Sequence, residues 1–462
     1  MIQVFYLNIK CLKKTPSTEE NSVNNFMAQL FAAQFPQNVN TNLIYDTQEE
    51  YYRPVKDTDF FGGTSITNAS KDAFGRQRVS EPFTLFDSSH RFKDNNLWST
   101  ATTGTASATF DTNEGLVDLT VDNSINSEVV RETTKVFSYQ PGKSLLIMNT
   151  FVMEPSKTGL RQRVGYYGAS NGIYLELANS VLYIVKRSSV SGVLVDTRIA
   201  QSSWNNDKLD GTGISGVTLD ISKAQILYAD IEWLGVGSVR VGFVINGQYL
   251  LCHVFNHANI ITSTYITTAS LPIRYEIKNT AATSGSSTMK QICSTVISEG
   301  GYELRGLQQA VTIPLNTPRD CTVANTYYPV ISLKLKSGFL DAIVILTALS
   351  MLGTGNNSVF NWQMIASGTT TGGSWVDAGA NSAVEYNISG TSFSGGRVLA
   401  SGYLTSSAQG QVAVDILKEA LFKFQLERNG LTSTPYELTL IIASKVAGDD
   451  VYASIDWEEI SR

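Results

Sequence analysis

Two carboxylates stand out because their spacing could place them on one face of a strand. Residues 226–235 read ILYADIEWLG, with Asp230 and Glu232 two positions apart. Side chains at alternate strand positions share a face, so these two are expected side by side, with Tyr228 next in the row. The opposite face is apolar and consists of Leu227, Ala229, Ile231 and Trp233. Carboxylates in this arrangement can serve as acid and nucleophile on a glycosidic bond. They can equally be two solvated groups on an outer sheet face.

The stretch Asp230-Ile-Glu232-Trp-Leu-Gly235 resembles the active-site strand of the laminarinase-like glycoside hydrolases. In that family a concanavalin-like sandwich carries Glu-x-Asp-x-Glu, where one carboxylate attacks the sugar and another protonates the leaving oxygen. Asp230 and Glu232 match the second and third positions, whereas Tyr228 stands where the family has its nucleophile. The resemblance therefore indicates a sandwich and argues against retaining hydrolysis. We predict no catalytic residues and a protein that is not an enzyme. Hydrolase or lyase activity at Asp230 and Glu232 is kept as the third hypothesis.

Two tryptophans in polar, loop-like segments could contact a ligand or another subunit. Trp204 lies in QSSWNNDKLDG, and Trp375 lies in TTTGGSWVDAG. An indole ring in such a place can stack on a sugar ring or anchor a subunit contact. The predicted glycan or interface contacts are therefore Trp204, Trp375, Asp230 and Glu232, and we favour interfaces for the tryptophans.

The sequence shows no pattern for a metal or cofactor site. His253 and His257 are four positions apart, which on a strand separates them by about 13 Å at roughly 3.3 Å per residue. That spacing is too long for one ion. The 4 cysteines are scattered without CxxC spacing, so neither a disulfide framework nor a zinc site is expected. We predict no cofactor, and synthesis in the reducing cytoplasm of a host.

Charge and hydropathy narrow the possible partners. The formal net charge is −6 at pH 7, whereas a nucleic-acid backbone attracts a basic surface. The longest apolar run, residues 339–349 (FLDAIVILTAL), is too short to span a bilayer and contains Asp341. We predict neither nucleic-acid binding nor membrane insertion. The pairs Arg76/Arg78 and Arg161/Arg163 would each face one way on a strand, and we expect them to meet carboxylates in a subunit contact.

Strands must position these residues, because β patterns dominate the chain. Residues 226–258 predict a three-stranded antiparallel meander, with a first turn at residues 235–238 and a second at Asn246-Gly247. Residues 71–305 continue as short alternating strands between turn clusters, and residues 306–462 form a smaller second series. The predicted fold is mainly β, with two antiparallel β-sandwich domains of the jelly-roll or concanavalin-like kind.

Residues 1–70 differ from both series. Residues 21–35 (NSVNNFMAQLFAAQF) carry apolar side chains at helical spacing, and Pro36 ends the pattern. One amphipathic helix of this length cannot fold alone, so its apolar face must dock on the protein's own sheet or on a partner subunit. We predict an N-terminal arm containing a short helix, whose attachment face is Phe26, Met27, Leu30 and Phe31.

Three further segments are similar to a known set of proteins. They are residues 72–87 (DAFGRQRVSEPFTLFD), continued by 94–99 (DNNLWS), residues 161–168 (RQRVGYYG) and residues 291–303 (QICSTVISEGGYE). Together they resemble a family of virion structural proteins of tailed phages and related marine viruses. The closing segment 454–460 (SIDWEEI) is similar to the C-terminal sandwich of those proteins. The resemblance implies a particle component, such as a fibre, a decoration or a minor capsid protein.

The predicted function is therefore that of a structural component of a virus particle, located in the virion. It would act by assembly with other virion proteins and with its own copies, as a homo-oligomer with a trimer favoured. The alternative is an adhesin, a receptor-binding fibre protein that recognises a glycan on the host surface.

Overall fold

The computed structural model describes residues 43–46, 51–54, 81–301, 303, 305–406 and 424–461. The chain divides into two compact units, residues 1–79 and 80–462. In the first unit, β1 (Leu43–Asp46) and β2 (Tyr51–Pro54) form an antiparallel hairpin. The helix predicted at residues 21–35, with Phe26, Met27, Leu30 and Phe31, lies outside the described residues.

The described part of residues 80–462 consists of antiparallel sheets, as predicted. Its helical turns are two short 3-10 helices, Gln201–Ser203 and Ser337–Phe339. Within the ranges that the structure describes, no helix is long and apolar enough to cross a membrane. The prediction of a mainly β protein is confirmed.

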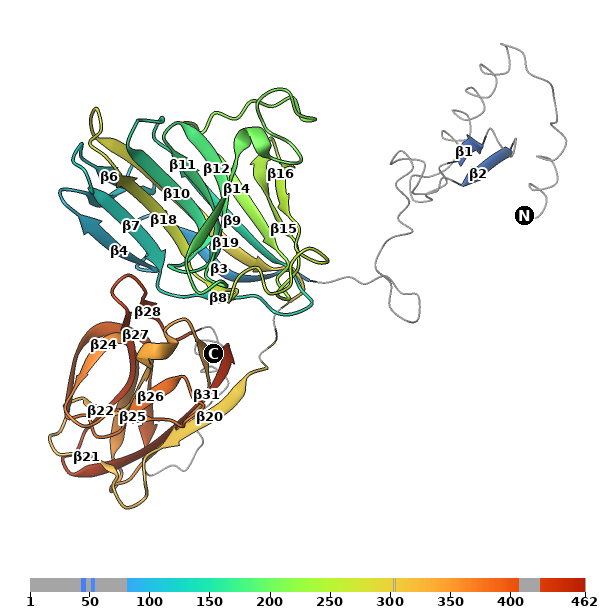
Figure 1. Cartoon of the computed structure of the whole chain (residues 1–462). Coiled ribbons are helices and arrows are strands. Elements are labelled where there is room, and N and C mark those ends of the chain that lie inside the picture. The colour runs from blue at the N-terminus through green and yellow to red at the C-terminus, as the bar shows by residue number, and fades with distance from the viewer. Residues whose placement is uncertain are drawn as a thin grey trace, which may run out of the picture. The chain divides into compact units, whose positions relative to one another are not determined.

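The first sandwich contains a seven-stranded sheet and an eight-stranded sheet, whose strands are labelled in Figure 1. The seven-stranded sheet has the order β13 (Val195–Ala200), β12 (Val181–Ser188), β11 (Gly172–Ala178), β10 (Leu160–Tyr167), β18 (Ile273–Asn279), β7 (Glu128–Thr133) and β4 (Trp98–Thr103). The eight-stranded sheet has the order β16 (Gln248–Phe255), β15 (Val239–Ile245), β14 (Gln225–Ile231), β9 (Leu145–Val152), β19 (Ser287–Ser298), β6 (Leu116–Val121) and β5 (Ser107–Asp111), and β3 (Phe83–Ser89) also pairs with β19. A short pair, β8 (Phe137–Ser138) and β17 (Ser270–Leu271), completes this part.

One apolar core joins the two large sheets, because alternate residues of each strand point inward. It includes Val164, Leu175 and Ile277 from the seven-stranded sheet and Ile147, Leu227 and Phe243 from the eight-stranded sheet. The predicted meander is present as β14, β15 and β16. Its second turn has φ 53° at Asn246 and φ 76° at Gly247. Positive φ at both positions matches the right-handed twist of a tight hairpin.

The second sandwich packs a six-stranded sheet on a four-stranded sheet around a separate core. The six-stranded order is β25 (Val376–Asp377), β26 (Val384–Asn387), β22 (Tyr328–Leu335), β30 (Glu437–Ser444), β24 (Val359–Thr371) and β27 (Ser392–Thr405). In the other sheet, β31 (Asp449–Ser461) pairs with β23 (Ile343–Gly353) on one edge and with β20 (Leu307–Thr312) and β21 (Arg319–Cys321) on the other. A small hairpin joins β28 (Arg428–Asn429) to β29 (Thr434–Pro435).

A junction of ionic and apolar contacts connects the two sandwiches within residues 80–462. Arg428 of the second sandwich is buried and donates to Glu132 Oε1 of the first at 2.6 Å. Arg274 of the first sandwich donates to the other oxygen of Glu132 at 2.8 Å. Asp341 accepts from Arg428 Nη2 at 2.9 Å. The apolar part of the junction consists of Val136, Ile343 and Ile345.

Candidate functional site

Strand β14 presents the predicted row of polar side chains on the outer face of the eight-stranded sheet. Leu227, Ala229 and Ile231 lie in the core, and Trp233 packs partly against it. The predicted alternation is therefore confirmed. In the antiparallel register, Asp230 lies opposite Arg240 of β15. The turn after β14 is closed by a hydrogen bond from Glu232 N to Ser238 O at 3.0 Å.

Asp230 and Glu232 line a polar pocket of about 350 Å³. Two chain segments form its walls. One is the turn between β8 and β9, and the other consists of the end of β14, the turn after it and the start of β15. The lining residues are Tyr139, Gly142, Lys143, Ser144, Asp230, Glu232, Ser238 and Arg240. We call this cavity the Asp230 pocket.

Asp230 is incompletely neutralised. Arg240 Nη1 lies 3.6 Å from its Oδ2, and Oδ1 is buried without a hydrogen-bond partner among the described residues. Burial raises the pKa of this carboxyl above its usual value, although the Arg240 charge and a hydrogen bond with Ser144 oppose the shift. A buried acceptor without a partner costs about 1–3 kcal/mol.

The other polar groups of the pocket differ in how firmly they are held. Glu232 is exposed, and its Oε2 accepts long hydrogen bonds of 3.4 Å from both the N–H and the hydroxyl of Ser238. Lys143 Nζ donates to Gly301 O at 3.2 Å and to a neighbouring glutamine. Tyr139 is only 5% exposed, and its hydroxyl has no hydrogen-bond partner in the described part of the chain. The pocket therefore combines a lysine held by two hydrogen bonds with an exposed carboxylate that is held only loosely.

The residue at the position of the glycoside hydrolase nucleophile, Tyr228, does not line the pocket. Tyr228 is buried, packs edge-on against Tyr249 with ring centroids 5.1 Å apart, and does not line the cavity. Burial raises the pKa of its phenol to about 12, which disfavours the phenolate. Glu232 lies in the turn directly after β14, two positions from Asp230. Without a carboxylate at position 228, the arrangement does not favour a covalent glycosyl intermediate.

The structure separates the two tryptophans predicted as surface contacts. Trp204 is 2% exposed, stacks on Phe243 at 6.4 Å and donates from Nε1 to Ile199 O at 3.2 Å. The prediction that Trp204 is exposed to a ligand or to another subunit is therefore wrong. Its loop folds back onto the core. Trp375, on the second sandwich, is partly exposed, and Lys334 Nζ lies 4.0 Å from its ring centroid. Neither indole lines the Asp230 pocket.

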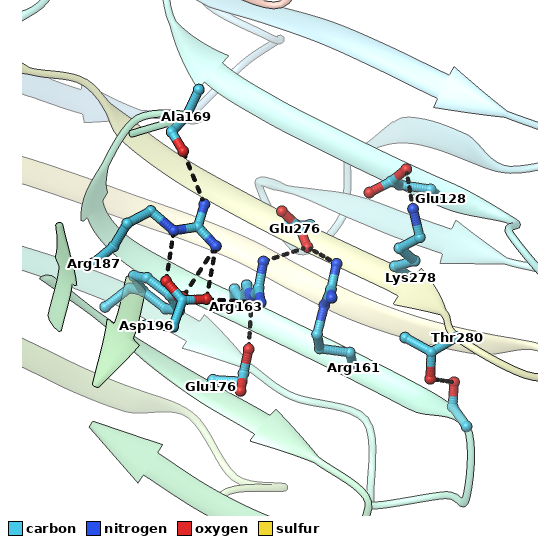
Figure 2. Close-up of polar contacts among 12 residues, drawn as sticks. Glu128, Arg161, Arg163, Ala169, Glu176, Arg187, Asp196, Glu276, Lys278 and Thr280 are labelled. Carbon is cyan, nitrogen blue, oxygen red and sulfur yellow. Dashed lines mark hydrogen bonds and ion pairs between the residues drawn. The ribbon is translucent and has the colours of Figure 1, made fainter. Parts of the chain in front are cut away.

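The outer face of the seven-stranded sheet carries a second polar cluster, which Figure 2 shows in close-up. We call it the ionic face. Arg163 Nε donates to Glu176 at 2.6 Å, and Arg161 Nη2 donates to Glu276 at 2.7 Å. Arg161 and Arg163 thus pair with carboxylates of their own chain, where the sequence predicted a subunit contact. Arg76 and Arg78 lie outside the described residues. The ionic face consists of Arg161, Arg163, Glu176, Arg187, Asp196, Arg198 and Glu276.

Arginine pairing dominates the electrostatics of the ionic face. Burial alone would raise the pKa of Glu176, but the hydrogen bonds and charges of Arg198 and Arg163 lower it below its usual value. Asp196 shows the same balance with Arg187. These carboxylates are therefore charged at neutral pH and paired with arginines, whereas Arg161 Nε is buried without a hydrogen-bond partner among the described residues.

The histidines do not form a metal centre together. His253 and His257 lie at the end of the β16 segment, with Phe255 between their rings. Among the described residues, no group of three or more histidine, cysteine or carboxylate side chains could hold a metal ion. His257 instead contacts the turn of the Asp230 pocket through Nδ1, which lies 2.6 Å from Gly237 O. Sequence reasoning missed this contact and the wall at residues 139–144, because both depend on distant segments.

The comparisons with known proteins give matches of low sequence identity and low TM-score. No protein-family model matches the sequence, and no curated protein matches it. Among solved structures, the Emp47p carbohydrate recognition domain is 13% identical, with a TM-score of 0.32, over 50% of this chain and 100% of its own. The Bacillus licheniformis beta-glucanase is 11% identical, with a TM-score of 0.31, over 49% and 100%. A carbohydrate esterase from Shiga toxin-encoding bacteriophage phi24B is 12% identical, with a TM-score of 0.29, over 48% and 100%. At TM-scores this low, none of these similarities bears on the function of the chain.

Proposed function

We propose that the protein is a structural component of a virus particle that acts by assembly. The observation that carries the proposal is where the structure places the segments that resemble virion proteins. Arg131 joins two of them, because it donates to Asp94 at 3.0 Å and to Gln291 at 2.8 Å. Residues 161–167 form β10 at the centre of the seven-stranded sheet and supply two arginines of the ionic face. The resembling residues thus build the frame of the sandwich.

A sheet held together by buried ion pairs suits a structural protein better than a soluble enzyme. Buried ion pairs are costly to break, since removing one partner costs about 3–5 kcal/mol. In this proposal residues 1–70 fasten the protein to the particle, and copies pack as a homo-oligomer, with a trimer favoured. The finer assignment of the sandwiches as jelly-roll or concanavalin-like belongs to the same proposal and is supported by two antiparallel sheets of seven and eight strands.

The test uses intact particles and an antibody raised against residues 307–462. Gold label on particle surfaces is expected, together with loss of incorporation when residues 1–70 are deleted. A matched deletion of the exposed hairpin tip at residues 190–194 should leave incorporation intact. Particles that lack the protein would overturn the proposal, and uptake of the truncated chain would overturn the role of the arm.

A second candidate function is glycan binding at the Asp230 pocket, as in a host-surface adhesin. The specific observation is that Asp230 and Glu232 line one polar cavity together with Lys143, Ser238 and Arg240. A sugar hydroxyl both donates and accepts hydrogen bonds, so adjacent hydroxyls can pair with the carboxylates and with the donors of this cavity. The volume of about 350 Å³ lies in the range of small-ligand sites. A neutral sugar is favoured, because Lys143 and Arg240 balance the charges of Asp230 and Glu232 in the lining.

Calorimetry with laminaritetraose and chitotetraose, two neutral probes, tests this second function. Asp230→Asn should weaken binding at least roughly tenfold, since the loss of a charge-assisted hydrogen bond is worth about 1.5–3 kcal/mol. Trp375→Ala, which alters a surface outside the pocket, serves as the matched control and should leave binding unchanged. Loss of binding with Trp375→Ala alone would place the glycan on the second sandwich. Turnover of either probe that Glu232→Gln abolishes would support the hydrolase hypothesis instead.

A further inference from the structure

The turn that carries Glu232 and Ser238 into the Asp230 pocket is held in place by a neighbouring loop. Tyr265 N donates to Gly235 O at 2.9 Å, and Tyr265 Oη donates to Glu232 O at 3.2 Å. A third bond joins His257 Nδ1 to Gly237 O at 2.6 Å. The pocket wall therefore takes its position from residues 257–265.

His257 is buried between polar and aromatic partners that fix its tautomer. Its ring is 2% exposed and lies parallel to Tyr265, with centroids 4.1 Å apart and an interplanar angle of 5°. A carbonyl oxygen only accepts, so Nδ1 carries the proton that bonds Gly237 O. Lys186 Nζ lies 2.9 Å from Nε2. An ammonium only donates, so Nε2 must present its lone pair. The geometry requires a neutral imidazole.

Protonation of His257 would break the contact between its Nε2 atom and Lys186. A proton on Nε2 would leave two donors and two positive charges facing each other at 2.9 Å. The groups around the ring offer no compensating negative charge among their contacts. They are Lys186 from β12, Tyr265 from the loop, and Phe255 with His253 behind it from β16. Burial first, and then the Lys186 charge, lower the pKa of His257 below its usual value.

We propose that His257 is a positioning residue for the Asp230 pocket and makes ligand binding there sensitive to acid. At neutral pH the imidazole links Lys186, inside the sandwich, to the backbone of the pocket turn. Once the pH falls below the lowered pKa of His257, the proton on Nε2 sets the imidazolium against Lys186, and the repulsion displaces the ring from its bond with Gly237 O. The expected change in ligand affinity rests on the proposed glycan binding at the pocket, whereas the expected movement of the turn is independent of that proposal.

The first experiment follows calorimetric binding of laminaritetraose and chitotetraose in steps from pH 7.5 down to the lowest pH at which the chain remains folded. We expect roughly tenfold weaker binding at the lowest pH, which corresponds to about 1.4 kcal/mol. His257→Gln keeps one donor and one acceptor but does not titrate, so it should flatten this dependence. His253→Gln is the matched control, because His253 is also a buried histidine with a lowered pKa but contacts Asn205 N at 3.3 Å, away from the turn. Asp230 and Glu232 are present in all of these proteins, so their contribution cancels in the comparison.

The second experiment uses the natural chain without a ligand. With 3 histidines in the chain, nitrogen NMR of the imidazoles should show His257 as the Nδ1–H tautomer at neutral pH. On acidification, the amide signals of Gly237 and Ser238 should shift with the midpoint of His257. Independent titration of these amides, or the same acid weakening in His257→Gln as in the natural chain, would overturn the proposal. Absence of binding to both probes at every pH would count against glycan binding, and the NMR result alone would then decide the role of His257.

Discussion

The two sheets of the first sandwich both carry charged side chains on their outer faces, but they neutralise them differently. On the seven-stranded sheet, Glu176 accepts from both Arg163 and Arg198 at 2.6 Å. On the eight-stranded sheet, Asp230 has one arginine at 3.6 Å and a carboxylate oxygen without a partner in the described ranges. The carboxylates of the first face are held by short ion pairs, whereas Asp230 is held more loosely. The difference indicates which charges maintain the fold and which can serve recognition.

The largest effect should follow from breaking the ionic face. Glu176→Ala leaves Arg163 and Arg198 without their shared carboxylate, and we expect a loss of about 3–5 kcal/mol in the free energy of unfolding. Urea unfolding at pH 7 measures it. Glu114→Ala, which removes an exposed ion pair with Lys290, is the control and should cost about 1 kcal/mol or less. Similar losses in both variants would show that the ionic face is no stronger than an ordinary surface pair.

A third region, around the buried side chain of His90, differs from both of these faces. Its ring nitrogens have no hydrogen-bond partners among the described residues. Burial, followed by the charge of Arg131, lowers the pKa of His90 to about 4. The unfolded chain therefore binds a proton on this residue at a higher pH than the folded chain. Stability should be fully present above about pH 6.5 and should fall as the pH approaches 4, by about 2–3 kcal/mol.

Urea unfolding at several pH values separates this contribution from those of the other groups. His90→Phe should lose less stability than the natural chain between pH 6.5 and 4. An equal loss in both proteins would mean that His90 does not carry the acid sensitivity.

The smallest effect is expected at Asp230. Burial raises the pKa of its carboxyl, so the charged form is disfavoured in the folded protein once the pH exceeds that raised value. Asp230→Asn removes this penalty and should stabilise the chain at pH 7 by about 0.5–1 kcal/mol, as substitutions at functional sites often do. Thermal unfolding at pH 7 and pH 3.5 checks the sign, because the gain should shrink at the lower pH. A clear loss of stability at pH 7 would show that Asp230 serves the fold, like Glu176.

Local patterns predicted the strands well, because alternation is a property of neighbouring residues. The order Leu227, Tyr228, Ala229, Asp230, Ile231 alone determines which side chains share a face, and the structure confirms it. The tight turn at Asn246-Gly247 follows from the same short range, since both residues tolerate positive φ.

Features that depend on distant contacts could not be predicted in this way. Trp204 and Trp375 occupy similar polar loops, yet the first is buried by Phe243 and the second is not. Likewise, Tyr139 is separated from Asp230 by about ninety residues, and only the β9–β14 pairing brings its turn beside the pocket. A Pro141-Gly142 turn before β9 marks a loop, but nothing in it indicates which strand end it will face.

The carboxylate of Glu132 has a mechanical consequence for a particle protein. Arginines from both sandwiches hold its two oxygens, Arg274 on one and Arg428 on the other. A pull on either sandwich must therefore stretch side-chain bonds at the junction before it extends the linking segment near residue 301. Single-molecule stretching should show a rupture at the junction that precedes unfolding of either sandwich. Replacing Arg428 by methionine should lower that rupture force and let the sandwiches separate under tension while each remains folded.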